Sequence, residues 1–117
     1  LKFLKNEYEL KSIVYKNEEK KLYLQFKDGF NSSLSTELLR VESPSAEVQG
    51  HSKLQKQIVL NKNNVAIKNI ERVGNYAVRI HFDDGHNTGI YSWRLLRSMA
   101  QNSEKIIKNY YNRLKKT

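Results

Sequence analysis

The chain has 117 residues, a size that fits one domain, and 38% of them are hydrophobic. It contains no cysteine, which excludes disulfides, thiolate chemistry and every cysteine-based ligand set for zinc or iron–sulfur clusters. Lys and Arg number 21 against 12 Asp and Glu, and the resulting net charge of +9 favours nucleic acid, an acidic protein or a membrane surface as a partner. A lysine-rich surface that only resists aggregation explains the charge equally well.

The first half of the chain reads as three strands followed by a helix. Residues 10–16 and 21–26 are the first two strands, and the polar sequence NEEK joins them. Asp28-Gly29 supplies the positive φ that a tight turn needs. A short strand then ends near Leu34, and Thr36 is the expected N-cap of the helix that follows.

The middle of the chain is polar. Ser43 and Pro44 suit a helix start, as N-cap and first helical residue. Gly50 suits the end of that helix. Residues 51–64 are predicted to form a long loop, a kind of segment that is often functional or mobile.

The second half follows the plan of the first. Strands are expected over residues 65–72 and 76–83. The turn Asp84-Gly85 comes next, and a short strand ends near Ile90. Ser92 is the expected N-cap of the following helix.

The two halves are an internal repeat. Residues 22–40 align with residues 78–97 when Phe26 is placed on Phe82, and the Asp-Gly of each copy then coincides. After one extra residue, the Leu-Leu-Arg that ends each copy also aligns. The sequence therefore predicts an α+β fold in which two similar β-hairpin-plus-helix halves share one mainly antiparallel sheet.

Residues 103–117 have no counterpart in the first half. They predict an added C-terminal helix, capped by Ser103, next to a domain at residues 1–102. Docking of its apolar face on the sheet is expected, and an anionic lipid surface is the alternative. That face consists of Ile106, Ile107, Tyr110, Tyr111 and Leu114. The basic residues of this tail are Lys105, Lys108, Arg113, Lys115 and Lys116.

The sequence HFDDGH at 81–86 is a candidate site. Its Asp-Gly recurs in the first copy and is best explained as turn chemistry, but His86 stands where the first copy has Phe30. Either an aromatic-sized group packs there in both halves or His86 serves chemistry, and His86→Phe is expected to leave folding intact. As a metal ligand, His86 would need partners such as His51, His81 or a nearby carboxylate, whose spacing predicts no site.

Patterns that indicate catalysis are missing from the sequence. No nucleophile-elbow glycines surround a serine, and no glycine-rich phosphate loop occurs. Asp83 and Asp84 are adjacent on a strand end and face opposite ways, which suits acid–base catalysis poorly. Tyr76, Tyr91 and Trp93 lie near arginines, as in single-strand nucleic-acid binders, but they suit a core and its rim as well.

Two stretches carry a family resemblance: SPSAEVQGH at 43–51 and IERVGNYAVRIHFDDGHNTGIYSWRLLR at 70–97. Over roughly residues 11–98 the chain resembles the family of small domains similar to the N-terminal domain of gamma-butyrobetaine hydroxylase. The resemblance implies an α+β fold. Members of that family occur alone in bacteria, ahead of the oxygenase domain in gamma-butyrobetaine and trimethyllysine hydroxylases, and behind Mrp-type ATPases that carry iron–sulfur clusters.

In the hydroxylases the domain resembles a zinc-binding module with three cysteines and one histidine. His86 falls where that histidine would lie. Because the three cysteines are missing here, the zinc site is not carried over and no cofactor is expected. The resemblance does not transfer the enzyme activity either, since the residues for iron and 2-oxoglutarate belong to another domain.

We therefore expect a non-catalytic accessory module that binds another protein, such as an Mrp-type ATPase or another factor of iron–sulfur cluster assembly or delivery. The alternatives are a basic protein associated with nucleic acid or ribonucleoprotein, and a metal-binding domain of an oxygenase-type system. The predicted contact surface is the second hairpin tip and the loop before it: Ser43, Glu47, Gln49, His51, Asp83, Asp84, His86, Asn87, Tyr91 and Trp93.

The expected location follows from what the sequence lacks. It shows neither an apolar run near about 18 residues nor a signal peptide. We expect a cytoplasmic protein. Because the chain begins at Leu1 and not at Met, a mitochondrial matrix protein that has lost a targeting segment is the alternative.

Overall fold

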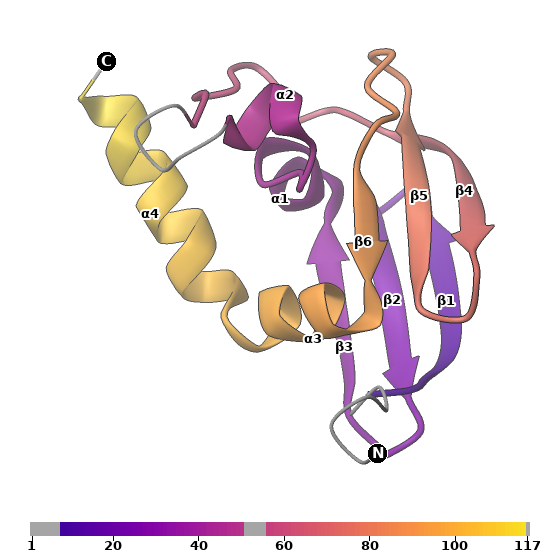
Figure 1. Ribbon diagram of the computed structural model, residues 1–117. Coiled ribbons are helices and arrows are strands. Elements are labelled where there is room, and N and C mark those ends of the chain that lie inside the picture. The colour runs from indigo at the N-terminus through magenta and orange to yellow at the C-terminus, as the bar shows by residue number, and fades with distance from the viewer. Residues whose placement is uncertain (1–7, 51–55, 117) are drawn as a thin grey trace.

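The computed structural model describes residues 8–50 and 56–116, which form two three-stranded antiparallel sheets and four helices (Figure 1). The first half consists of β1 (Leu10–Lys16), β2 (Lys21–Phe26), β3 (Asn31–Ser35), α1 (Thr36–Val41) and α2 (Ala46–Gln49). The second half consists of β4 (Ile67–Val73), β5 (Ala77–Phe82), β6 (Ile90–Ser92), α3 (Trp93–Gln101) and α4 (Ser103–Lys115). The predicted α+β class, with its added C-terminal helix, is confirmed.

The strands form two sheets, so the prediction of one shared sheet is wrong. The strand order is β1-β2-β3 in one sheet and β4-β5-β6 in the other. A single core cluster contains the inward side chains of both central strands, such as Leu24 of β2 and Ile80 of β5. Each sheet has one apolar face, and placing the two faces against each other removes more apolar surface from water than joining the sheets edge to edge.

The ends of the predicted strands are close to the observed ones. β1 and β2 have the predicted bounds, whereas the strands predicted at 65–72 and 76–83 run over Ile67–Val73 and Ala77–Phe82. Residues 56–64 contain no helix or strand, as predicted for a loop, and residues 51–55 lie outside the described part of the chain.

The two hairpin tips repeat each other bond by bond. The Phe26 amide donates to the Phe30 carbonyl at 2.9 Å, and the Phe82 amide donates to the His86 carbonyl at the same distance. The ring centroids are 5.9 Å apart in the first pair and 6.0 Å apart in the second. An aromatic-sized ring therefore packs at this point in both halves.

Each tip turns at its Asp-Gly. Gly29 has a φ of +94° and Gly85 a φ of +92°, a backbone region that favours glycine. Asp28 and Asp84 each accept a hydrogen bond from the backbone amide two residues later, at 3.1 Å in both cases. The interpretation of these residues as turn chemistry is confirmed.

The two halves are connected by a reciprocal pair of ionic contacts. Arg40, at the end of the first copy, binds the carboxylate of Asp84 at 2.8 Å. Arg97, at the end of the second copy, binds the carboxylate of Asp28 at 2.9 Å. The arginine of each helix thus holds the turn of the opposite half.

Ser35, and not Thr36, caps α1. The Ser35 hydroxyl accepts from the Leu38 amide, whereas Thr36 is buried and donates to the Val65 carbonyl at 2.6 Å. In the second half the predicted cap is the observed one, since Ser92 caps α3. Thr36 is committed to a contact between the halves, which leaves the preceding serine to cap the helix.

The caps predicted for the other two helices also differ from the observed ones. α2 begins after Ser45, whose hydroxyl accepts from the Glu47 amide, because Ser43 is held by another partner. Gly50 ends α2, as predicted. Asn102, not Ser103, precedes α4 and makes no side-chain cap bond.

The C-terminal helix was predicted to dock on the sheet. It packs instead against α1, α3 and the loop before β4 (Figure 1). Tyr110 is buried, and its hydroxyl donates to the Val59 carbonyl. Arg113 binds Glu42 at 3.0 Å. Within the described residues, no helix is long and apolar enough to cross a membrane.

Candidate functional site

The second hairpin tip meets the segment around α2 in a group of polar side chains. We name Arg40, Ser43, Glu47, Asp84 and His86 the hairpin cluster. The Nε2 atom of His86 lies 2.8 Å from the Ser43 hydroxyl, and its Nδ1 atom lies 3.2 Å from a Glu47 carboxylate oxygen. The structure thus brings His86 together with a serine that lies 43 positions before it in the sequence.

Burial determines the protonation of His86. It lowers the pKa of the imidazole below its ordinary value, and Arg40 lowers it further, against the opposing influence of Glu47 and Asp84. The ring is therefore neutral at neutral pH. Because the Glu47 carboxylate can only accept, the proton belongs on Nδ1, and Nε2 then accepts from the Ser43 hydroxyl.

Asp84 is held by two cations. Its carboxylate binds Arg40 at 2.8 Å and Lys62 at 2.7 Å, and its side chain is 17% exposed. Burial by itself would raise the pKa of Asp84, but the hydrogen bonds from Lys62, from the His86 amide and from Arg40 outweigh it and lower the pKa to about 2. Asp84 is ionised throughout the physiological pH range.

Asp83 takes no part in the cluster. It lies on the exposed side of the strand end and accepts a hydrogen bond from the Ala66 amide at 3.1 Å. Asp83 and Asp84 therefore have separate partners, as their opposite orientations predicted. His81 is also separate and contacts Glu71 at 3.1 Å.

Ser43, His86 and Glu47 stand in the order nucleophile, base and carboxylate that serine hydrolases use. Ser43, however, has no exposed surface. Gly89 lies so close that an added Cβ would come within 2.5 Å of the Ser43 hydroxyl. A substrate could not reach this hydroxyl in the structure, so the arrangement positions the loop and offers no accessible nucleophile.

The metal ligation proposed for His86 receives no support from its surroundings. Both ring nitrogens already have partners. Residues 8–50 and 56–116 contain no group of three His, Asp or Glu side chains that could hold a metal ion. His51 lies outside the described residues, so its predicted role cannot be placed.

The predicted contact surface divides into buried and exposed residues. Glu47, Asp83 and Asn87 are exposed, and Gln49 is half-buried with its amide donating to the Ser43 carbonyl at 2.8 Å. Asp84 is exposed as a residue, although its side chain is only 17% exposed. The other described members offer almost no surface to a partner, because they are buried: Ser43, His86, Tyr91 and Trp93.

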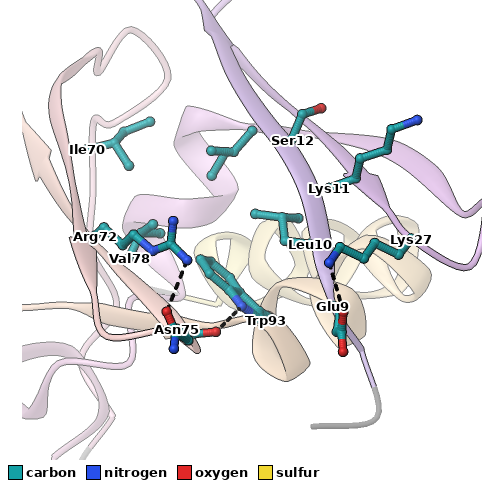
Figure 2. Close-up of a pocket in the computed structure, with 11 residues that line it drawn as sticks. Glu9, Leu10, Lys11, Ser12, Lys27, Ile70, Arg72, Asn75, Val78 and Trp93 are labelled. Carbon is teal, nitrogen blue, oxygen red and sulfur yellow. Dashed lines mark hydrogen bonds and ion pairs between the residues drawn. The ribbon is translucent and has the colours of Figure 1, made fainter.

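An open groove with a volume of about 760 Å³ lies elsewhere, between β1 and the β4–β5 hairpin (Figure 2). We name it the inter-sheet groove. Leu10, Ile70, Val78 and Trp93 give it an apolar lining. The Trp93 indole donates to the Asn75 carbonyl at 2.8 Å, which fixes the ring at one end of the groove. The sequence pattern gave no sign of this groove.

Charged side chains surround the apolar lining. Lys11, Lys27 and Arg72 are cationic, and Glu9 is the only acidic residue among the described residues that line the groove. Lys27 pairs with Glu9 at 3.0 Å, whereas Arg72 donates to the Gly74 carbonyl at 3.0 Å. The groove therefore combines an apolar centre with a positive margin.

The basic tail is exposed on one side of α4. Lys105, Lys108, Lys115 and Lys116 are all exposed. Arg113 differs, because it is half-buried and paired with Glu42.

Comparison with known proteins gives a family. A family model described as gamma-butyrobetaine hydroxylase-like, N-terminal, matches residues 13–97. A crystal structure of a protein of unknown function from Acidithiobacillus ferrooxidans, which belongs to the DUF971 family, is 37% identical with a TM-score of 0.67. The match covers 79% of this chain and 92% of that one.

Two solution structures determined by NMR are also similar. One is 43% identical with a TM-score of 0.82, and the match covers 96% of this chain and 83% of that one. The other is 34% identical with a TM-score of 0.75, with 93% and 86% covered. No curated protein matches the chain. Neither the family nor these structures gives evidence for catalysis.

Proposed function

The chain belongs to the gamma-butyrobetaine hydroxylase-like N-terminal family, and we propose that it is a non-catalytic accessory module that binds another protein. The observation that carries the proposal is the inter-sheet groove, which leaves apolar side chains accessible between two edge strands. Accessible apolar surface with a polar margin is typical of protein-binding sites.

The hairpin cluster supports the proposal because its polar groups are bonded to one another within the protein. Its serine is buried, its histidine is bonded at both nitrogens, and its aspartate is neutralised by two cations. These groups are used within the protein and position the loop around α2 on the second hairpin. Binding through the groove requires none of them to react.

The resemblance to domains found behind Mrp-type ATPases suggests the kind of partner. We propose a factor of iron–sulfur cluster assembly or delivery, such as an ATPase of that type. The protein itself would need no cofactor in this role. A zinc site of the hydroxylase kind would need three cysteines that the sequence lacks.

Capture of partners from a lysate of the source cells tests the proposal. Tagged protein and tag alone would be incubated under anaerobic conditions at low and at high salt, and retained proteins would be identified by mass spectrometry. We expect specific proteins that stay bound at high salt and that co-elute with the purified protein in gel filtration. Retention of nothing beyond the tag control would contradict the proposal.

Nucleic-acid binding through α4 is a second candidate function. The observation that favours it is the exposure of four lysines on the side of α4 that faces away from buried Tyr110. In the capture experiment this function predicts nucleic acid or ribosomal material that is lost at high salt, because phosphate contacts weaken with salt.

A further inference from the structure

The inter-sheet groove lies between two strands that have no strand partner among residues 8–50 and 56–116 on the sides that face it. β1 and β4 are edge strands of their sheets. The Ile67 amide at the start of β4 donates to the Tyr15 hydroxyl near the end of β1, at 3.2 Å. The two strands are antiparallel, with the end of β1 beside the start of β4 at this contact. Leu10, at the other end of β1, and Arg72, near the end of β4, line the open part of the groove.

The free edge of β1 is the more accessible of the two. Four consecutive residues of β1, from Leu10 to Ile13, line the groove. Lys11 is the extra residue of a bulge between Leu10 and Ser12 in the pairing with β2, so no residue of that strand stands opposite it. Ser12 and Ile13, which follow the bulge, point to opposite faces of the strand, and because both line the groove, the groove runs along the edge of β1.

The side chains around this edge set the character of an occupant. The accessible apolar side chains of the lining are those of Leu10, Ile13 and Ile70, which are half-buried, whereas Val78 and Trp93 line the groove with little exposed surface (Figure 2). An extended segment would place every second side chain against these apolar residues. Its other side chains would face the cationic margin formed by Lys11 and Arg72, which favours Asp and Glu.

We propose that the groove binds an extended segment of the partner protein, with alternating apolar and acidic residues, that adds as a strand to the free edge of β1. This inference rests on the proposed function, since it names the part of the partner that is recognised. Backbone hydrogen bonds to β1 would provide affinity, and the apolar and acidic side chains would provide selectivity.

Selection from a displayed library of random peptides of about eight residues tests the inference without knowledge of the partner. The groove variant is Lys11→Glu with Arg72→Glu, which changes two exposed residues of the lining. The control variant is Lys21→Glu with Lys68→Glu, two exposed lysines outside the lining. Both variants carry the same change in charge.

We expect the selected peptides to alternate apolar residues with Asp or Glu. They should bind the wild type and the control variant with equal affinity. Their affinity for the groove variant should be lower by about tenfold or more. On peptide addition, the amides of Leu10–Ile13 should show the largest NMR shifts and slower hydrogen exchange. Selected peptides without acidic residues, equal binding to the groove variant, or shifts centred on another face would each overturn the inference.

Repeating the lysate capture with the same variants separates the two proposals. A partner retained by the wild type and the control variant but lost from the groove variant supports the inference. The same partner retained by all three forms overturns the inference and leaves the proposed function standing. A change in the sedimentation of the groove variant alone, without any peptide, would assign the groove to a second copy of the chain and overturn the inference.

Discussion

Gly89 is one of the residues at which the second half departs from the repeat. With Phe26 aligned on Phe82, the first half has Ser33 at the same position. Glycine is required in the second half because the Ser43 hydroxyl approaches its Cα, and a Cβ there would lie 2.5 Å from that oxygen. Another departure, His86 for Phe30, supplies the hydrogen bond to the same serine. Both exchanges therefore accommodate the segment around α2.

Gly89→Ala is expected to lower the free energy of unfolding by about 1–3 kcal/mol, the usual cost of forcing extra atoms into a packed site. Urea denaturation would measure the change. The matched control is Ser33→Ala in the first half, which should alter stability by about 0.5 kcal/mol or less. A Gly89→Ala protein as stable as the control would show that Ser43 can move away at little cost.

His86 should make stability depend on pH. Because its pKa is lowered in the folded protein, the unfolded chain binds the proton more readily. The contribution of His86 is therefore fully present above its ordinary pKa of about 6.5 and is lost as the pH falls through the lowered folded value. Urea midpoints measured at about pH 8 and about pH 5 should show this loss, and it should shrink in His86→Phe. Equal losses in both proteins would mean that groups other than His86 cause the loss of stability at low pH.

The exchange His86→Phe itself now has a different expected outcome from the one that the repeat predicted. Phenylalanine would fill the same space beside Phe82, but the buried Ser43 hydroxyl would lose its acceptor. A buried hydroxyl without its partner costs about 1–3 kcal/mol. The sequence could show the position of the ring in the repeat, but it could not show which distant residue meets its nitrogens.

At the scale of elements, reciprocal contacts between helices and turns connect the two halves, in addition to the core cluster that they share. The arginine at the end of each repeated copy binds the turn aspartate of the other copy. The two contacts differ in burial, since the Asp84 side chain is 17% exposed and that of Asp28 is 52% exposed. Asp84 also has Lys62 as a second cation. The contact at Asp84 is therefore expected to contribute more to the free energy of unfolding than the contact at Asp28.

Asp84→Asn should destabilise the protein by about 1.5–3 kcal/mol, the range for hydrogen bonds to a charged group. Asp28→Asn, its matched control in the other turn, should have a smaller effect, because water screens that exposed pair. Guanidinium denaturation of both variants, with the wild type, would rank them. A larger loss for Asp28→Asn would contradict the ranking by burial.

The elements themselves could be predicted from the sequence, whereas their caps and their assembly could not. Alternation in residues 10–16 and 21–26 gave strands with the observed bounds, and the Asp-Gly pairs gave the turns. The predicted cap at Thr36 is wrong because its hydroxyl serves a carbonyl 29 residues away. Local sequence shows that a hydroxyl can cap a helix, but not that a distant acceptor competes for it.

At the scale of the whole molecule, the inter-sheet groove arises from how the two sheets meet. They touch where Tyr15 accepts from the Ile67 amide, and β1 and β4 separate beyond this point. The alternation of each strand predicts which of its faces is buried, but not which sheet edges face each other. The sequence therefore could not predict this groove, and the contact surface predicted at the second hairpin includes side chains that are in fact buried.

The C-terminal helix can be tested for two roles that one deletion would confuse. Removal of residues 103–117 would take buried Tyr110 out of the core, and loss of a large buried aromatic residue costs about 3 kcal/mol or more. Replacement of Lys105, Lys108, Lys115 and Lys116 by Gln should instead change the free energy of unfolding by about 0.5 kcal/mol or less, because all four are exposed.

This neutral variant isolates the charge of α4 from its packing. If α4 binds nucleic acid, affinity for a single-stranded RNA should fall in the variant. The slope of log affinity against log salt should then decrease by about 0.7 for each lysine that contacts a phosphate. Fluorescence titration at several salt concentrations measures both quantities. An unchanged slope would mean that these lysines contact no phosphate and would leave α4 as a structural helix that packs through Tyr110 and Arg113.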